Sequence, residues 1–69
     1  MNLSVNGELK LIETKDTMVS LLFVIEQLGV NSKLIVVEFN GEIINSKNWS
    51  EQKVQDGDVL EIVTIVGGG

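Results

Sequence analysis

Two Asn-Gly dipeptides, at positions 6–7 and 40–41, constrain the fold of this chain more than any other feature of its sequence. Asparagine and glycine tolerate the positive φ angles of the tightest hairpin turns, so Asn-Gly between apolar runs predicts a pair of antiparallel strands. Both dipeptides are flanked by residues with the alternating or β-branched character of strands. The sequence therefore predicts two β-hairpins, one at its start and one past its middle.

The strands can be assigned from the apolar residues around each turn. The first hairpin is defined by five such residues, Leu3, Val5, Leu9, Leu11 and Ile12. The second is expected to pair residues 34–39 with 42–44. The turn signal Asp56-Gly57-Asp58 precedes one more apolar run, which predicts a final strand over 59–66.

Between the hairpins, apolar residues recur at intervals of three and four, the spacing of one helix face. This stripe consists of Met18, Leu21, Leu22, Ile25 and Leu28. Asp16 and Thr17 precede it, and their side-chain oxygens can cap the first unpaired N–H groups of a helix. Gly29 suits a left-handed stop. The sequence thus predicts a helix from just after Thr17 to Leu28, with the stripe in the core.

Three further apolar residues, Val19, Phe23 and Val24, lie outside this stripe. Val19 and Phe23 are four residues apart and would form a second apolar face of the helix. We expect the segment 45–55, a connecting turn anchored by Trp49, to cover that face. The alternative is a contact site for a partner or for a second copy of the chain.

Hairpin, helix, short hairpin, crossover and final strand give a ββαββ order and an α+β fold. With one helix available for one sheet, the economical packing lays the helix across a mixed β-sheet. We expect the last strand to pair in parallel with the first. We also expect residues 1–69 to form a single domain with a flexible glycine tail at 67–69.

Missing residue types restrict the chemistry. The chain has no histidine and no cysteine, so it lacks the usual neutral-pH general base, the thiolate nucleophile and the soft metal ligands. Asp56 and Asp58 are the obvious carboxylate pair, but they flank one glycine and are interpreted as turn residues. They also do not continue into a calcium-loop pattern. We expect no catalytic residue, no metal and no cofactor bound by this chain.

The charge balance argues against nucleic acid and membrane partners. Ten acidic residues against five scattered lysines, with no arginine, give a net charge of -5, which phosphate backbones repel. No apolar run approaches the roughly 18 residues that span a bilayer, and the N-terminus lacks signal-peptide character. We expect a cytoplasmic protein whose acidic surface is steered toward a basic groove of another protein.

The chain ends in Gly67-Gly68-Gly69, directly after the last apolar run. Without Cβ atoms, such a tail can pass through a narrow channel, and residues 66–69 would span about 13 Å if extended. The α-carboxyl group, with an ordinary pKa of about 3.3–3.7, is ionised and can attack the α-phosphate of ATP. The adenylate formed can accept sulfur. We therefore expect a thiocarboxylate on Gly69, with Gly67 and Gly68 inserted into a partner's active site.

Side chains on the last strand alternate between its two faces. If Leu60 and Ile62 face the core, their neighbours point outward, close to the tail. A docking surface for partners is therefore expected at Glu61, Val63, Ile65 and Val66.

Four segments in this order resemble ThiS, the sulfur-carrier family of thiamin biosynthesis, whose fold is the ubiquitin-like β-grasp. They are Asn6-Gly7, Thr17-x-x-x-Leu21-Leu22 with Leu28-Gly29, the hairpin from Val37 to Ile43, and Trp49 followed by Asp56-Gly57-Asp58 and the glycine end. The family's terminal Gly-Gly pair maps onto Gly68 and Gly69, and Gly67 is additional.

The resemblance implies three partners. They are an E1-like adenylating enzyme of the ThiF type, which uses ATP and Mg²⁺, a sulfur-donating enzyme, and a thiazole synthase of the ThiG type. The chain itself would be a protein co-substrate and not an enzyme.

Other readings share the same fold. The small subunit of molybdopterin synthase carries the same chemistry, but those chains are usually longer and have proline near the tail, whereas this chain has none. A carrier for transfer-RNA thiolation, a ubiquitin-like protein modifier and a non-covalent binding module remain alternatives.

Overall fold

The computed structural model describes residues 1–65, so Val66 and the predicted glycine tail lie outside the described residues. In chain order the described elements are β1 (Asn2–Val5), β2 (Glu8–Leu11), β3 (Met18–Ser20), α1 (Leu21–Leu28), β4 (Ile35–Phe39), β5 (Glu42–Ile44), β6 (Lys53–Gln55) and β7 (Val59–Thr64). Two short 3₁₀ turns, η1 (Ser32–Leu34) and η2 (Ser46–Asn48), connect α1 to β4 and β5 to β6.

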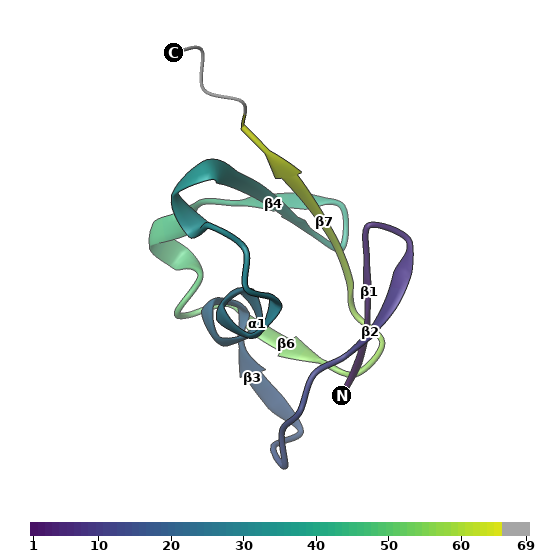
Figure 1. The fold of residues 1–69 in the computed structure, drawn as a ribbon. Helices are drawn as coiled ribbons and strands as arrows, with labels where there is room; N and C mark the ends of the chain where they lie inside the picture. Colours follow the sequence, from purple (N-terminus) through teal and green to yellow (C-terminus); the bar gives the residue numbers. More distant parts are fainter. Residues whose placement is uncertain (66–69) are drawn as a thin grey trace.

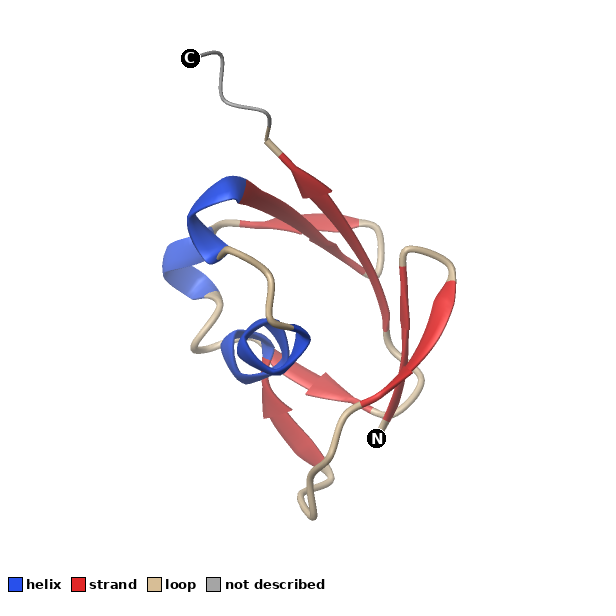
Figure 2. Cartoon of the chain, in the orientation of Figure 1, coloured by secondary structure: helices blue, strands red, loops and turns tan. Residues whose placement is uncertain are grey.

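Five strands form one mixed sheet in the order β2-β1-β7-β4-β5. β1 and β7 run in parallel, with Ser4 opposite Val59 and Val5 opposite Leu60, and the other neighbours in this sheet are antiparallel. The short helix α1 lies across one face of the sheet (Figure 1), and strands dominate the rest of the chain (Figure 2). The predicted α+β fold, with the last strand parallel to the first, is confirmed.

Both predicted hairpins are present, and their turns explain the two Asn-Gly dipeptides. Asn6 and Gly7 have φ angles of 53° and 80°, and Asn40 and Gly41 have 49° and 87°. Two consecutive positive φ angles match the right-handed twist of the flanking strands. Most residues disfavour a positive φ, whereas asparagine and glycine tolerate it. The turns therefore fix the registers of β1 with β2 and of β4 with β5.

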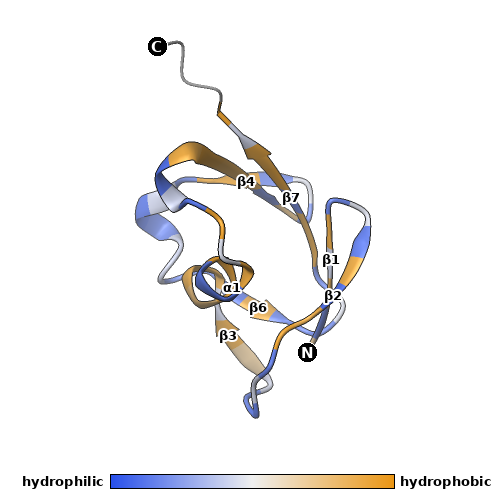
Figure 3. Cartoon of the chain, in the orientation of Figure 1, coloured by the Kyte–Doolittle hydropathy of each residue, from blue (hydrophilic) through white to orange (hydrophobic). Residues whose placement is uncertain are grey.

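Apolar side chains from the helix and both sheets meet in one core. Its largest fully buried members are Leu3, Leu21, Val24, Ile25, Val37, Val54 and Leu60. Figure 3 shows the same distribution, with apolar colouring along α1, β4 and β7 and hydrophilic residues in the turns. Since the chain has no cysteine, this packing is the main source of stability.

The helix begins later than predicted. Ser20, and not Asp16 or Thr17, caps α1, because its Oγ accepts a hydrogen bond of 3.0 Å from the backbone N–H of Phe23. Met18, expected in the core stripe, lies in β3 and is 50% exposed. The predicted end is correct, since Gly29 adopts the left-handed conformation with φ of 73°.

A second, two-stranded sheet explains this difference. β3 pairs with β6, and Val19 lies opposite Val54, both buried. Met18 to Ser20 thus pair with a segment more than thirty residues away in the sequence. This pairing outweighs the helical spacing of the apolar residues that begins at Met18. The segment 45–55 was expected to be only a connecting turn, and that prediction is wrong because residues 53–55 form β6.

Other expectations for this region are confirmed. Trp49 is buried, and its indole N–H donates a hydrogen bond of 2.9 Å to the carbonyl of Ile44, so it does anchor the connection. Val19 and Val24 are buried and Phe23 is half-buried against the core. The expected burial of Val19 and Val24 is therefore confirmed, but the expected second helix face is wrong, because Val19 lies in β3 and not in α1.

A paired substitution tests the corrected helix start. Ser20→Ala removes the cap and is expected to lower the free energy of unfolding by about 1 kcal/mol. Thr17→Ala serves as the control and should change it by less than about 0.5 kcal/mol, because Thr17 is exposed and lies outside the helix. Urea denaturation followed by circular dichroism measures both. A larger loss of stability for Thr17→Ala than for Ser20→Ala would instead support a helix capped by Thr17.

Candidate functional site

The C-terminal strand β7 occupies the centre of the main sheet. It pairs with β1 on one side and β4 on the other, and Val63 lies opposite Val36 near its end. Beyond the strand, the backbone N–H of Ile65 donates a hydrogen bond of 2.6 Å to the carbonyl of Leu34. The chain is therefore held on the sheet up to the last residue described.

β7 ends at Thr64, two residues earlier than predicted. Its side chains alternate as expected, with Leu60 fully buried and Ile62 partly buried. Val63 and Ile65 are 60% and 48% exposed, and Glu61 is exposed beside them. Val66, the fourth predicted docking residue, lies outside the described residues, as do Gly67, Gly68 and Gly69. Docking itself remains a prediction, for which the structure provides accessible side chains.

The face of the sheet that carries Val63 is both apolar and acidic. Glu61 lies directly opposite Glu38 on β4, and Ile43 on β5 lies opposite Glu38 on its other side. Like charges directly opposite each other on neighbouring strands disfavour pairing. None of the five lysines lies on β1, β4, β5 or β7. A partner that combines apolar side chains with a cationic group would complement this face.

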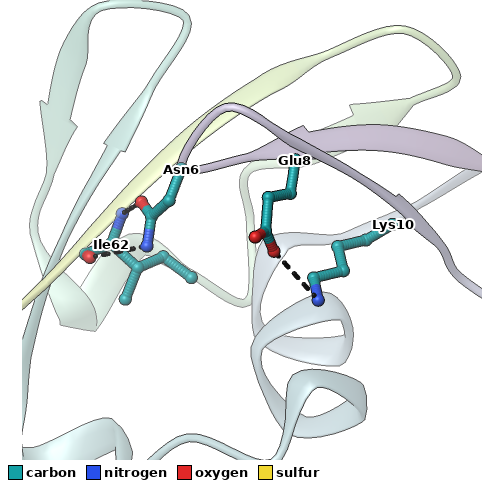
Figure 4. A network of polar contacts seen from close by, with 4 residues as sticks. All are labelled: Asn6, Glu8, Lys10 and Ile62. Atoms are coloured by element: carbon teal, nitrogen blue, oxygen red, sulfur yellow. Dashed lines mark hydrogen bonds and ion pairs between the residues drawn. The ribbon is translucent and has the colours of Figure 1, made fainter.

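Asn6 contributes an interaction that the sequence interpretation missed. Its side-chain Oδ1 accepts a hydrogen bond of 2.6 Å from the backbone N–H of Ile62, and its Nδ2 donates one of 3.2 Å to the carbonyl of Ile62 (Figure 4). The two bonds extend the pairing of β1 with β7 past Val5, toward the end of β7. Local sequence gives no signal for this contact, because its partners are 56 residues apart.

Asp56 and Asp58 act as turn residues, as predicted. A carboxylate oxygen of Asp58 accepts a hydrogen bond of 2.9 Å from the N–H of Gln55, which closes the turn before β7. Asp56 accepts one of 2.7 Å from the N–H of Asn2, which ties this turn to the start of β1. Gly57 between them has a φ of 91°. Both carboxylates are thus used in positioning β7 against β1.

A cluster of metal ligands, a groove or a membrane-spanning helix in the described residues would also bear on function. Residues 1–65 include no group of three or more metal-ligating side chains. A groove of about 630 Å³ lies between β2, the end of α1 and β7, and its polar lining includes Glu8, Lys10 and Glu13. Within the same range, no helix is long and apolar enough to cross a membrane. The outer face of β7 is the candidate site because Val63 and Ile65 are exposed there, next to the C-terminal glycines in the sequence.

Replacing Asn6 tests how β7 is held. Asn6→Gly keeps the positive φ of the turn but removes both bonds to Ile62, and should lower the free energy of unfolding by about 1 kcal/mol. Asn6→Asp keeps the acceptor, loses the donor and places a negative charge near the Ile62 carbonyl, so it should also destabilise. Urea denaturation and hydrogen exchange at the Ile62 amide measure both effects. Wild-type stability and exchange in Asn6→Gly would show that the two bonds contribute nothing.

Comparison with known proteins gives a consistent result. The family model described as the ThiS family matches residues 3–69. The sulfur carrier protein ThiS of Thermus thermophilus is 34% identical over 64 residues, which cover 93% of this chain and 94% of that protein. A thiazole synthase of Paramagnetospirillum magneticum is 41% identical over 69 residues. That match includes all of this chain but spans only 20% of the relative's length.

The fold agrees with the sequence matches. The crystal structure of the thiamine biosynthesis protein ThiS from Geobacter metallireducens superposes with a TM-score of 0.85 at 30% identity, and the match covers 100% of both chains. That likeness includes the mixed sheet with its single covering helix. With a family match over nearly its whole length and the same β-grasp architecture, the chain belongs to the ThiS family of ubiquitin-like proteins.

Proposed function

We propose that this chain is a sulfur carrier of thiamin biosynthesis, and that its reacting group is the carboxyl group of Gly69. The observation that carries the proposal is the family match over residues 3–69, which includes the three terminal glycines. The position of β7 supports it, because a strand held from both sides leads directly toward these glycines. A stable domain then presents a reactive end to other proteins.

The chemistry has two steps. First, a carboxylate oxygen of Gly69 attacks the α-phosphorus of ATP, an acyl adenylate forms and pyrophosphate leaves. Second, a hydrosulfide equivalent attacks the carbonyl carbon, the bond between that carbon and the phosphate-bridging oxygen breaks, and AMP leaves. The product is a thiocarboxylate on Gly69. The chain supplies the carboxylate and the docking surface, and partner enzymes supply the ATP site, Mg²⁺ and the sulfur.

Three partners follow from this scheme. An E1-like adenylating enzyme of the ThiF type activates Gly69, a sulfur-donating enzyme provides the sulfur, and a ThiG-type thiazole synthase receives it. The relative from Paramagnetospirillum magneticum supports the last of these, because a protein named thiazole synthase contains a region similar to this entire chain. We place this protein and its partners in the cytoplasm. In this scheme the chain is a co-substrate and not an enzyme.

Each partner must accept the tail, so each also meets the outer face of β7. We assign docking to the exposed side chains of Glu61, Val63 and Ile65, together with Val66. Glycines 67 and 68 then occupy the narrow channel that leads to the reacting centre, since any side chain there would add width.

Intact mass spectrometry tests the proposed function. Incubation with ATP, Mg²⁺, the adenylating enzyme and a sulfur donor should add about 16 Da, the difference between oxygen and sulfur, to the C-terminal peptide alone. Removal of Gly68 and Gly69 together, which leaves no terminal Gly-Gly pair, should abolish the gain. No mass change with a partner set that is active on another carrier would favour a non-covalent binding module instead.

A substitution on the outer face tests docking separately from the tail. Val63→Asp should reduce kcat/KM for adenylation at least about tenfold, because it puts a charge into an apolar contact. It should change stability by less than about 1 kcal/mol, since Val63 is 60% exposed.

Val59→Asp is the matched control. Val59 lies on the same strand and face but four residues farther from the tail, and it is 43% exposed. Its kcat/KM should stay close to the wild-type value. Equal adenylation of the Val63→Asp variant and the wild-type chain would remove Val63 from the docking surface.

A further inference from the structure

Strand β2 forms one edge of the main sheet, and all four of its residues are exposed. Two of them are large and apolar: Leu9 is 77% exposed and Leu11 is 65% exposed. An edge strand with exposed leucines and free backbone groups is a template for pairing with another strand. This edge lies two strands away from β7, the proposed sulfur-carrier site, so an inference about it does not rest on that function.

The hydrogen-bond pattern shows which backbone groups are free. Met1 and Ile12 exchange hydrogen bonds in both directions, at 2.8 and 3.1 Å. Because such pairs alternate along an antiparallel ladder, Lys10 and Glu8 bond β1, whereas the N–H and C=O groups of Leu9 and Leu11 point away from it. The free edge therefore presents two donors and two acceptors at alternate positions.

Side chains on β2 are sorted by face and by character. Lys10 lies opposite Leu3 and Glu8 opposite Val5, both core residues, so the charged pair is on the helix side of the sheet. The carboxylate of Glu8 and the ammonium group of Lys10 are 3.4 Å apart (Figure 4). Leu9 and Leu11 occupy the opposite face. The edge thus carries one charge of each sign on one face and two leucines on the other.

We propose that two copies of this chain pair through β2, antiparallel and related by a twofold axis at Leu9. If the helices of both copies are to lie on the same side of the joined sheet, residues directly opposite each other must point to the same face. Leu9 then pairs with Leu9 of the second copy, or the register shifts by one residue at the axis, to Lys10 or to Glu8.

The charges choose among these registers. With Leu9 at the axis, Glu8 lies opposite Lys10 of the second copy, and this attraction occurs twice by symmetry. With Lys10 or Glu8 at the axis, like charges face each other. The Leu9 register also pairs the outward backbone groups of Leu9 with their own copies, and it gathers four leucines on the outer face, since diagonal neighbours are within reach of each other. A register with Lys10 at the axis would pair Leu9 with Leu11 of the second copy and so satisfy more outward backbone groups, but it places the two lysines face to face. The charges therefore select the Leu9 register.

The interface consists of a single short strand from each copy, so it is smaller than that of most stable dimers, and the chain's net charge of -5 opposes association. We expect a weak dimer with a dissociation constant on the order of 0.1–1 mM at moderate salt.

Charge reversal tests the proposed register. Sedimentation equilibrium of the full chain, from about 20 μM to 2 mM, should show a monomer–dimer equilibrium in that range. Glu8→Lys and Lys10→Glu should each weaken dimerisation at least about tenfold, because each turns two attractions into two repulsions. The double variant Glu8→Lys/Lys10→Glu should regain the wild-type dissociation constant. An equimolar mixture of the two single variants should form a heterodimer at least as strong as the wild-type dimer, because each charge then faces an opposite one.

Lys53→Glu on β6 is the matched control, because it makes the same change in charge as Lys10→Glu at another exposed strand position. Circular dichroism confirms that each variant is folded. A monomer throughout the concentration range would overturn the proposal. It would also be overturned by dimers that tolerate both single reversals, or by a double variant that stays as weak as the single ones.

Discussion

The parallel pairing of β1 with β7 is the constraint on which the rest of this structure depends. It joins the first and last strands at the centre of the sheet, so the two hairpin halves share one core. Only two residue pairs make up the ladder, Ser4 with Val59 and Val5 with Leu60. Polar side chains extend it at both ends, since Asn6 binds the backbone of Ile62 and Asp56 binds that of Asn2. Without this pairing, β7 would be held by β4 alone, and the N-terminal hairpin would not join the same sheet.

Electrostatics and packing are divided between the two faces of the sheet. The helix side carries the core, whereas the outer side combines exposed valine and isoleucine with the opposed pair Glu38 and Glu61. That pair contributes nothing obvious to folding, because like charges disfavour strand pairing. Its position close to Val63 suits the docking that we propose, and the proposed ATP-using partner would itself hold cationic groups for the phosphates. Acidic carrier and cationic enzyme would then attract each other before the tail enters.

Features that depend on neighbouring residues could be predicted from the sequence. Asn6-Gly7 and Asn40-Gly41 identified both hairpin turns, and Gly29 identified the end of the helix, because positive φ angles are governed by local sterics. The short strands β3 and β6 could not be predicted in this way. Three residues carry too little periodicity, and Val19 pairs with Val54 only after the chain has folded back on itself. The same limit applies to the site. Alternation on β7 predicted that Val63 is exposed. The contact of Asn6 with Ile62 could not be predicted, because it links distant segments.

The proposed function requires that the carboxyl group of Gly69 is the group that reacts with ATP. The most direct test starts from a chain whose terminal carboxyl group carries a heavy oxygen isotope and takes it through one full cycle of activation and sulfur transfer. The AMP released should gain one labelled oxygen, about 2 Da, because the oxygen that attacks the α-phosphorus stays with the phosphate. Unlabelled AMP would contradict it, since ATP would then have been cleaved without attack by this carboxylate.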